Sequence, residues 1–366
     1  MTVFACLILL VCLCGCHSAT TNSSGFEECR IDFSECEQLH WSELPDSILG
    51  KKQYIVLDTT NAECDFRQMS KVLLDDRYIY ILDAYLKKLV VYDYEGNGIA
   101  RIGNRGEGPQ EYLDISDFDV APDGTLYFID GQLNKLFCFD KEFRFLYNKP
   151  LPFETDVLTV VDKGILWGLS SWNKKECEGY KVVRTDRDIH VTDSLLTYDE
   201  YVDPSFWISY YSFIRSRDNI SYNQPIDNHI YLFDNLGQLK SCIYIDFGKQ
   251  NVPDEVKKDV ETNLAFFDRY CMLKNYTVVT DKVIAGTLLK ANKTVPFILD
   301  RIGNRCYYDT PREDLDNSRT AGFSNSFWIS YYEPDTEIDE ELPDSVLHNL
   351  ENGCFILCLQ TLGCIR

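Results

Sequence analysis

The sequence is poor in positive charge. Its 366 residues include 36 Lys and Arg against 58 Asp and Glu, which gives a formal net charge of −22. A chain this acidic repels the phosphate backbones of DNA and RNA, whose binding requires the opposite sign. Nucleic acids are therefore excluded as partners. The acidity is interpreted as a source of solubility, and attraction of cations or basic peptides is the alternative interpretation.

Histidine is also scarce, and no two histidines stand at the spacing of a metal-ligand pair. The five are His17, His40, His190, His229 and His348. A Cys29-x6-Cys36-x3-His40 pattern is a loose candidate for Zn²⁺, but its spacing matches no strong motif. A disulfide or free thiols are favoured over a metal there, and no metal or cofactor is predicted.

The sequence lacks the common catalytic signatures. There is no G-x-S-x-G nucleophile elbow, and the Asp-box of sialidase propellers does not occur. The loop Gly103-Asn-Arg-Gly106-Glu-Gly108 has no Lys-Ser/Thr after its glycines and no strand-to-helix junction, so it is not a phosphate loop. It is interpreted as an irregular connection between strands, and no catalytic residue is predicted.

Low-complexity tracts are missing as well, and only 12 Pro and 20 Gly are present. With 45% hydrophobic and 26% charged residues the chain is globular rather than disordered. Aromatic residues reach 13%, an excess that suits pleated, half-buried surfaces and favours β structure.

The N-terminal residues predict where the protein is located in the cell. The apolar run Val3 to Leu13 is too short to span a bilayer and has the size of a signal-peptide core. Leu13-Cys14-Gly15-Cys16 resembles the lipobox of bacterial lipoproteins, in which the cysteine matching Cys16 is diacylated and becomes the mature N-terminus. No Lys or Arg lies between Met1 and Cys16, which departs from the basic start of such signals. The alternative is a secretory signal cleaved near Ala19.

Lipidation would anchor the protein to a membrane, because two or three acyl chains bind firmly. We therefore expect a signal peptide over 1–16, a tether and lead-in segment over 17–40 and one domain over 41–366. Removal of the four cysteines up to Cys16 leaves 11 of the 15, an odd number. Most of the 11 lie in apolar strand patterns and are interpreted as small core residues.

Residues 76–102 repeat themselves without a gap at residues 123–149, an offset of 47. Identities such as Asp83 with Asp130 alternate with apolar exchanges such as Ile79 for Leu126. The strands expected in the first copy are Tyr78–Leu82, Lys88–Tyr92 and Ile99–Ile102, and those in the second are Thr125–Ile129, Lys135–Phe139 and Arg144–Tyr147. Short, evenly spaced strands in units of this length predict propeller blades.

Two further patterns fit this fold. A turn motif recurs as Tyr92-Asp93-x-x-Gly96, Phe233-Asp234-x-x-Gly237 and Leu299-Asp300-x-x-Gly303. Its Asp is expected to accept backbone hydrogen bonds, which makes these residues turn-formers rather than ligands or catalysts. We also expect Gln53–Asp58 and Cys354–Thr361, near opposite chain ends, to lie in neighbouring or shared blades.

A heptapeptide is duplicated letter for letter. Ser205-Phe-Trp-Ile-Ser-Tyr-Tyr211 returns as Ser326 to Tyr332, 121 residues later. Equivalent strands in two blades are the favoured explanation. The alternative is an aromatic platform for stacking on sugars or peptides, and its candidate ligand-binding residues are Trp207, Tyr211, Trp328 and Tyr332.

One segment breaks the β pattern. Pro253 to Tyr270 places Val256, Val260, Leu264 and Phe267 on a helical stripe, which predicts one inserted amphipathic helix. Room remains for six or seven units of the repeat length. The expected fold is an all-β, six-bladed β-propeller with one inserted amphipathic helix.

The sequence resembles the six-bladed β-propeller lipoproteins of Bacteroidota, which are related in shape to NHL-repeat propellers. Their I-G-x-x-G-x-G-P-x-E-Y motif matches Ile102, Gly103, Gly106, Gly108, Pro109, Glu111 and Tyr112. Similarity extends over Trp41–Leu57, Asp117–Asp130 and Ile245–Lys249, the last followed by Pro253. The chain departs from the family at Asn352-Gly353-Cys354, where many members have Asn-Pro.

The resemblance implies a protein of the cell envelope that binds or senses a ligand. The leading hypothesis is a lipoprotein anchored to the outer membrane, on its periplasmic or surface face, that binds a glycan, a peptide or an envelope protein. The competing hypothesis is a hydrolase or lyase acting on glycans or peptides. A funnel of clustered carboxylates or metal-bound histidines would favour the enzyme. A third possibility, a structural subunit, predicts an exposed apolar patch.

Overall fold

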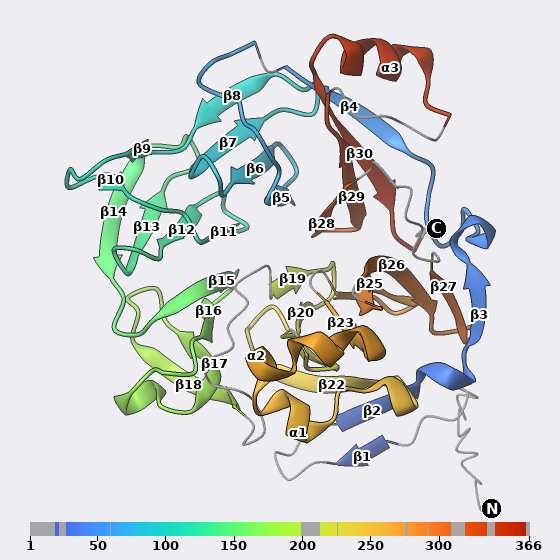
Figure 1. Ribbon diagram of the computed structural model, residues 1–366. Coiled ribbons are helices and arrows are strands. Elements are labelled where there is room, and N and C mark those ends of the chain that lie inside the picture. The colour runs from blue at the N-terminus through green and yellow to red at the C-terminus, as the bar shows by residue number, and fades with distance from the viewer. Residues whose placement is uncertain are drawn as a thin grey trace, which may run out of the picture.

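The computed structural model describes residues 19–21, 27–58, 60–198, 213–224, 226–274, 277–291, 293–308, 319–334 and 341–363. Within this part of the chain the strands form six sheets around a common axis, and the prediction of a six-bladed β-propeller is confirmed (Figure 1). In the same part of the chain, no helix is both long and apolar enough to cross a membrane.

Each blade is an antiparallel sheet whose first strand lies at the axis and whose last strand lies at the rim. Blade 1 contains β5 (Lys71–Leu74), β6 (Ile79–Asp83), β7 (Lys88–Tyr92) and β8 (Gly98–Arg101). Blade 2 contains β11 (Asp117–Val120), β12 (Leu126–Asp130), β13 (Lys135–Phe139) and β14 (Phe145–Pro150). Blade 3 contains β15 (Thr155–Val161), β16 (Gly164–Leu169), β17 (Tyr180–Thr185) and β18 (Val191–Thr197).

The second half of the ring follows the same plan. Blade 4 contains β19 (Phe213–Arg215), β20 (Ile220–Tyr222), β21 (His229–Phe233) and β22 (Leu239–Asp246). Blade 5 contains β23 (Cys271–Leu273), β24 (Val278–Val279), β25 (Val283–Lys290), β26 (Lys293–Asp300) and β27 (Arg305–Tyr308). Blade 6 contains β28 (Arg319–Ser324), β29 (Phe327–Tyr332), β30 (Phe355–Thr361) and β4 (Gln53–Leu57).

The ring is closed by both chain ends. Strand β4, from the N-terminal part, pairs antiparallel with β30 from the C-terminal part, as expected from the sequence. At the axis, Ser324 Oγ accepts a hydrogen bond from Leu74 N at 2.8 Å, and Asn325 Nδ2 donates to Leu74 O at 2.8 Å. Blade 6 is therefore joined to blade 1 by hydrogen bonds at the channel, in addition to the β4–β30 pairing.

Residues before β4 also belong to the propeller. Strand β2 (Glu27–Asp32) pairs in parallel with β22 of blade 4, and β3 (Glu37–His40) pairs in parallel with β27 of blade 5. The short β1 (Ala19–Thr21) pairs with β2. These strands precede residue 41, where the domain is predicted to start, and extend the sheets of blades 4 and 5. These segments cover the outer edges of two blades, which would otherwise present unpaired backbone groups.

The repeat in the sequence corresponds to the second, third and fourth strands of blades 1 and 2. Its most informative identity is Asp83 with Asp130, both fully buried. Asp130 Oδ2 accepts a hydrogen bond from Leu113 N at 2.7 Å, and its Oδ1 accepts from Gln132 N and Leu133 N. Asp83 binds the equivalent backbone groups in blade 1. Each carboxylate ties the loop that enters its blade to the turn after the blade's second strand.

The recurring Asp of the Asp-x-x-Gly motif forms turns, as predicted. Asp93 Oδ1 accepts a hydrogen bond from Asn97 N at 2.8 Å, and Asp234 Oδ1 accepts from Gln238 N at 2.8 Å. Asp300 Oδ1 accepts from Ile302 N and Gly303 N. All three turns join the third strand of a blade to the fourth.

Helical segments are short and few. The predicted helix over Pro253–Tyr270 is divided into α1 (Asp254–Lys257), α2 (Val260–Asn263) and the 3₁₀ helix η5 (Leu264–Arg269). The division falls at Asp259, whose backbone is not helical and whose side chain caps α2 by accepting a hydrogen bond from Thr262 N. Val256, Val260 and Phe267 are buried as the stripe predicted, whereas Leu264 is exposed.

The other helices lie in connections between strands. They are η1 (Phe33–Glu35), η2 (Trp41–Glu43), η3 (Lys175–Cys177), η4 (Gly248–Gln250) and α3 (Asp344–Glu351), the last inserted between β29 and β30. Helix α3 was not predicted from the sequence. Its buried Val346 and Leu350 pack with Tyr332 and Ile356, which covers one side of blade 6.

The hydrophobic core lies between neighbouring blades, because both faces of each sheet are covered.

The cysteines behave as the sequence predicted. Cys138, Cys242, Cys271 and Cys306 are buried among apolar side chains. Burial raises the pKa of the Cys271 thiol to about 12, so this thiol is protonated and unreactive at neutral pH.

The glycine-rich family motif forms a compact loop between blades 1 and 2. Within it, β9 (Asn104–Arg105) pairs in parallel with β10 (Glu111–Tyr112). Glu111 Oε2 accepts a hydrogen bond from Gly108 N at 2.8 Å, and a Cβ on Gly106 would lie 2.1 Å from this oxygen. The glycines therefore leave space for the Glu111 carboxylate, and the loop is an inter-blade connection as predicted.

This contact predicts the effect of adding one methyl group. Gly106→Ala should displace the Glu111 carboxylate and break its bond to Gly108 N, at a cost of about 1–2 kcal/mol in the free energy of unfolding. Urea denaturation of Gly106→Ala in the wild-type and Glu111→Ala backgrounds measures the coupling. An equal cost in both backgrounds would show that the collision with Glu111 is not the cause.

Candidate functional site

The two faces of the propeller differ in their connections. The turn face carries the tight turns that follow the first and the third strand of each blade, such as Asp75–Tyr78 and Asp93–Asn97. The loop face carries the longer connections between blades, including α1, α2 and η5, and the turns after each second strand. The channel along the axis opens on the turn face into two hollows.

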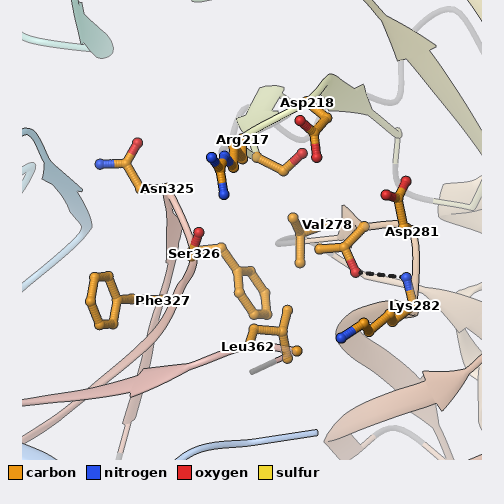
Figure 2. A pocket seen from close by; sticks show the side chains of 13 residues that line it. Arg217, Asp218, Val278, Asp281, Lys282, Asn325, Ser326, Phe327 and Leu362 are labelled. Atoms are coloured by element: carbon orange, nitrogen blue, oxygen red, sulfur yellow. Dashed lines mark hydrogen bonds between the residues drawn. The ribbon is translucent and has the colours of Figure 1, made fainter. Parts of the chain in front are cut away.

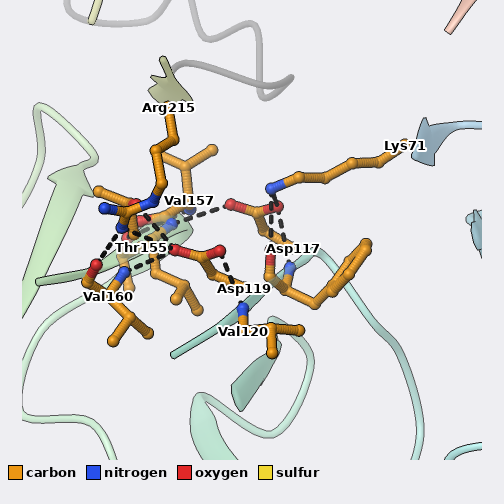
Figure 3. Close-up of polar contacts among 11 residues, drawn as sticks. Lys71, Asp117, Asp119, Val120, Thr155, Val157, Val160 and Arg215 are labelled. Carbon is orange, nitrogen blue, oxygen red and sulfur yellow. Dashed lines mark hydrogen bonds and ion pairs between the residues drawn. The ribbon is translucent and has the colours of Figure 1, made fainter. Parts of the chain in front are cut away.

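The channel wall is polar where the first strands of blades 1, 2 and 3 meet (Figure 3). Lys71 of β5 and Asp117 of β11 form an ion pair with a 2.6 Å Nζ–Oδ1 distance, and both side chains are almost fully buried. Lys71 Nζ also donates to Phe118 O at 2.8 Å, and Asp117 Oδ2 accepts from Leu158 N at 2.9 Å. Burial raises the pKa of the Asp117 carboxyl, and the adjacent Lys71 ammonium opposes that rise.

A second acid–base pair lies next to the first. Asp119 Oδ2 accepts hydrogen bonds from Thr159 Oγ1 at 2.8 Å and from Val160 N at 2.7 Å, and Arg215 of β19 lies 3.6 Å away. Arg215 also donates to Val160 O and to Thr159 Oγ1. Both carboxylates thus have their acceptor positions filled by protein donors. The network links blades 2, 3 and 4 across the channel, and its contacts hold these blades together.

The wide hollow opens above this network. It is bordered by the turns of blades 1 and 2, by Lys141, and by Arg215 and Asn325 near the axis, and it contains about 1260 Å³ including open solvent. Asp75 and Asp123 on its wall are engaged in their own turns, because they accept hydrogen bonds from Tyr78 N and Thr125 N. Asp76, Arg77 and Lys141 on the same wall are exposed and can reach a ligand.

The narrow hollow lies between the turns of blades 4, 5 and 6 and contains about 590 Å³ including open solvent (Figure 2). Its floor is formed by Val278, Phe323 and Leu362, which are all buried. Charged side chains of both signs surround the floor. They are Arg217, Asp218, Asp281 and Lys282. Asn325 borders both hollows, so the two openings adjoin at the axis.

The described residues of the predicted aromatic platform lie inside the fold. Trp328 is 4% exposed and packs against Trp41 and Phe323, and Tyr332 is 1% exposed and accepts a hydrogen bond from Lys52 Nζ at 3.1 Å. Both belong to β29, the second strand of blade 6. A ligand contact by these rings stays a prediction, and their burial weighs against it. Trp207, Tyr211 and Cys16 lie outside the described residues.

The loose zinc candidate has other partners in the structure. Cys36 Sγ donates to Asn304 Oδ1 at 3.4 Å, and His40 Nδ1 lies 2.8 Å from Ser42 Oγ. Across the part of the chain that the structure describes, no three His, Cys, Asp or Glu side chains are placed to hold a metal ion.

A third polar cluster lies buried between blades 3 and 4, near the loop face. Lys181 is fully buried with its Nζ 3.4 Å from Asp227 Oδ2, and His229 Nδ1 lies 2.5 Å from Asp227 Oδ1. Burial opposes the charge of Asp227, but Lys181 and His229 outweigh it and hold its pKa well below the ordinary value. Burial would likewise lower the pKa of His229, but Asp227 and Glu28 raise it above its ordinary value.

This cluster predicts a pH dependence of stability. The pKa of His229 is higher in the folded than in the unfolded chain, so its stabilisation is present below the unfolded pKa of about 6.5 and is lost as pH rises through the folded pKa. Urea denaturation from pH 6 to 9 should show a free-energy difference between the wild type and His229→Gln that shrinks with rising pH. A difference that grows with pH would contradict the assignment.

No sequence motif marks the channel residues Lys71, Asp117, Asp119 and Arg215. They come from three strands that are far apart in the sequence, and only the closed ring of blades brings them together. One signal was available. Asp117 and Asp119 alternate with apolar residues in a strand, which places two carboxylates on one face of an otherwise hydrophobic element.

Comparisons with known proteins agree with this fold. The family described as "Domain of unknown function (DUF4934)" matches residues 29–351. A crystal structure of a Bacteroides fragilis protein, described by its name as exported, superimposes with a TM-score of 0.71 and 18% identity over 91% of this chain and 99% of its own. A DUF4221 family member from Bacteroides vulgatus gives 0.52 and 10% identity over 87% and 99%. No curated protein matches the sequence. At these identities the likeness shows the fold alone.

Proposed function

We propose that this chain, which belongs to the DUF4934 family, is an envelope lipoprotein. Its propeller binds a ligand at the channel mouth on the turn face. The ligand is a peptide, a glycan or part of an envelope protein. Cys16 is the proposed lipid anchor, and the outer membrane is the proposed location.

The observation that supports binding most strongly is the contrast between the channel and the wide hollow above it. The channel charges are paired with one another, as in Lys71–Asp117, so they are occupied in holding the blades. The wide hollow instead has an open mouth walled by polar and charged groups from several blades. Concave sites with a few convergent polar groups are typical of ligand binding.

The same contrast counts against a catalytic role for the carboxylates of the channel, which the competing enzyme hypothesis would need there. Hydrolysis or elimination requires a carboxylate, histidine or nucleophile that is free to exchange a proton with the substrate. Asp117 and Asp119 each accept several hydrogen bonds from the protein. Among the described residues that border the two hollows, none is a histidine or a cysteine.

A thermal-shift screen of the mature chain against peptides and glycans tests the proposal, because a ligand that binds the folded state raises the melting temperature. A ligand that binds the wide hollow should lose most of its effect in Asp76→Lys and in Lys141→Glu, whose side chains border it. Glu176→Lys, an exposed charge reversal in η3 on the loop face, is the matched control. A ligand that no longer raises the melting temperature of the control variant, but still raises that of the other two variants, would place the site on the loop face.

The anchor is tested separately. Cys16→Ala should release the protein from membranes into the soluble fraction, because acylation requires the cysteine thiol. Fractionation of cells that produce each variant, with Cys14→Ala as the matched control, measures this. Retention of Cys16→Ala on the membrane would remove the lipoprotein assignment while leaving the binding proposal intact.

A further inference from the structure

The narrow hollow has a rigid apolar floor. Phe323 packs edge-to-face against Trp328 with ring centroids 4.7 Å apart, and Trp328 is itself in contact with Trp41 at 5.4 Å. Val278 and Leu362 complete a surface that is buried and tightly packed from below. The floor is therefore preformed, and an apolar group that enters the hollow does not have to order it first.

The rim of the hollow is charged, and three of its four charged side chains have no partner among the described residues. Arg217, Asp218 and Asp281 make no ion pair or side-chain hydrogen bond within the described part of the chain. Figure 2 shows Arg217 and Asp218 on one side of the hollow and Asp281 with Lys282 on the other. In the adjoining channel, by contrast, Lys71 and Arg215 are both paired with carboxylates.

An apolar floor with unpaired charges of both signs restricts the ligand chemistry. A sugar carries a hydroxyl group on most ring carbons, and these would lose hydration against Val278, Phe323 and Leu362 without gaining a hydrogen bond, which is unfavourable. An aliphatic or aromatic amino-acid side chain suits the floor. A carboxylate next to that side chain can pair with the Arg217 guanidinium, and neighbouring amide N–H groups can donate to Asp218 or Asp281.

We propose that the narrow hollow binds the carboxy-terminal residue of a peptide that ends in an apolar amino acid. The inference rests on the proposed function and specifies its ligand class. The apolar side chain lies on Phe323 and Leu362, and the terminal carboxylate pairs with Arg217. The preceding residues pass Asn325, which borders both hollows, and enter the wide hollow.

Calorimetric titration of the mature chain with the peptide Gly-Ser-Gly-Ser-Gly-Leu tests this inference. The free acid should bind, and the C-terminal amide of the same peptide should bind at least tenfold more weakly because it cannot form the ion pair. A peptide ending in Asp should also bind at least tenfold more weakly, because its side chain would place a charge on the apolar floor.

Variants locate the binding. Arg217→Gln should weaken binding of the free acid about tenfold while leaving the affinity for the amide unchanged, which corresponds to about 1.4 kcal/mol. Ser326→Tyr should fill the hollow and abolish binding. Arg105→Gln, an exposed arginine in the loop between blades 1 and 2, is the matched control and should have no effect.

Equal affinity for acid and amide, or an unchanged affinity in Arg217→Gln, would overturn the assignment of the carboxylate. No binding by any of these peptides would overturn the inference as a whole. The proposed function survives that result if ligands from the thermal-shift screen still depend on Lys141, and it fails together with the inference if no ligand stabilises the chain.

Discussion

Replacement of Lys71 by methionine is expected to lower the free energy of unfolding by about 3–5 kcal/mol, because it leaves the Asp117 carboxylate buried without its counter-ion. The two side chains are 9% and 5% exposed, so water cannot take the place of the ammonium. Methionine retains most of the volume of lysine, which limits the loss of packing. Urea denaturation followed by tryptophan fluorescence measures the effect.

A double-mutant cycle separates the ion pair from other contributions. Asp117→Asn should also destabilise the protein, and the double variant Lys71→Met/Asp117→Asn should lose at least about 1 kcal/mol less than the sum of the two single losses. The exposed pair Lys141–Glu142, at 3.8 Å, is the control, and its disruption should change stability by less than about 1 kcal/mol. Strict additivity at Lys71 and Asp117 would show that the pair does not link blades 1 and 2 energetically.

Replacement of Asp130 by alanine is the second large effect. Its carboxylate accepts backbone hydrogen bonds from Leu113, Gln132 and Leu133, and the side chain is fully buried. Alanine removes the charged acceptor of three partly buried N–H groups, and each hydrogen bond to a charged group contributes about 1.5–3 kcal/mol. A loss of roughly 3–5 kcal/mol in the free energy of unfolding is expected, with exchange of these amide protons accelerated in hydrogen-exchange experiments.

The repeat offers a second test of the Asp130→Ala prediction and a control for it. Asp83→Ala should have a similar effect, because Asp83 makes the equivalent contacts in blade 1. Asp140→Ala removes an Asp that also accepts two backbone hydrogen bonds, but in a solvated turn of the same blade, and should destabilise the protein much less than Asp130→Ala. Equal losses at Asp130 and Asp140 would show that burial is not the reason for the large effect of Asp130→Ala.

The fold was largely predictable from the sequence because its information is local and repeated. Short strands alternate with turns, and the Asp and Gly of each turn motif serve to form that turn. The offset of 47 residues between the two copies gives the length of one blade. The pairing of Gln53–Leu57 with Phe355–Thr361 also followed, because a closed ring requires the two chain ends to meet. Strands β7 and β13 begin and end at the predicted residues.

The features that were missed depend on contacts between distant residues. Nothing in the sequence of Glu27–Asp32 indicates that it pairs with blade 4, since an edge strand needs only a free neighbour. The predicted helix is interrupted at Asp259 because this residue does not continue α1, and its side chain caps the start of α2. The duplicated heptapeptide was correctly matched to a strand in its second copy, but burial of Trp328 and Tyr332 depends on Trp41, Tyr54 and α3, which come from elsewhere in the chain.

The site was less predictable than the fold for the same reason. Each hollow is built from turns of several blades that are far apart in the sequence. A single turn such as Ser216-Arg217-Asp218 is an ordinary polar surface segment. Its proposed role depends on its sharing one hollow with Asp281 and Phe323.

Hydrogen–deuterium exchange of the mature chain, with and without a ligand that raises its melting temperature, tests the binding proposal most directly. Occupation of the channel mouth predicts slower exchange in the turn-face segments 74–77, 120–124, 216–218, 280–282 and 325–327, and unchanged exchange in the loop-face segments 84–87, 131–134 and 170–179. Protection of the loop-face segments with no change at the channel mouth would contradict the account.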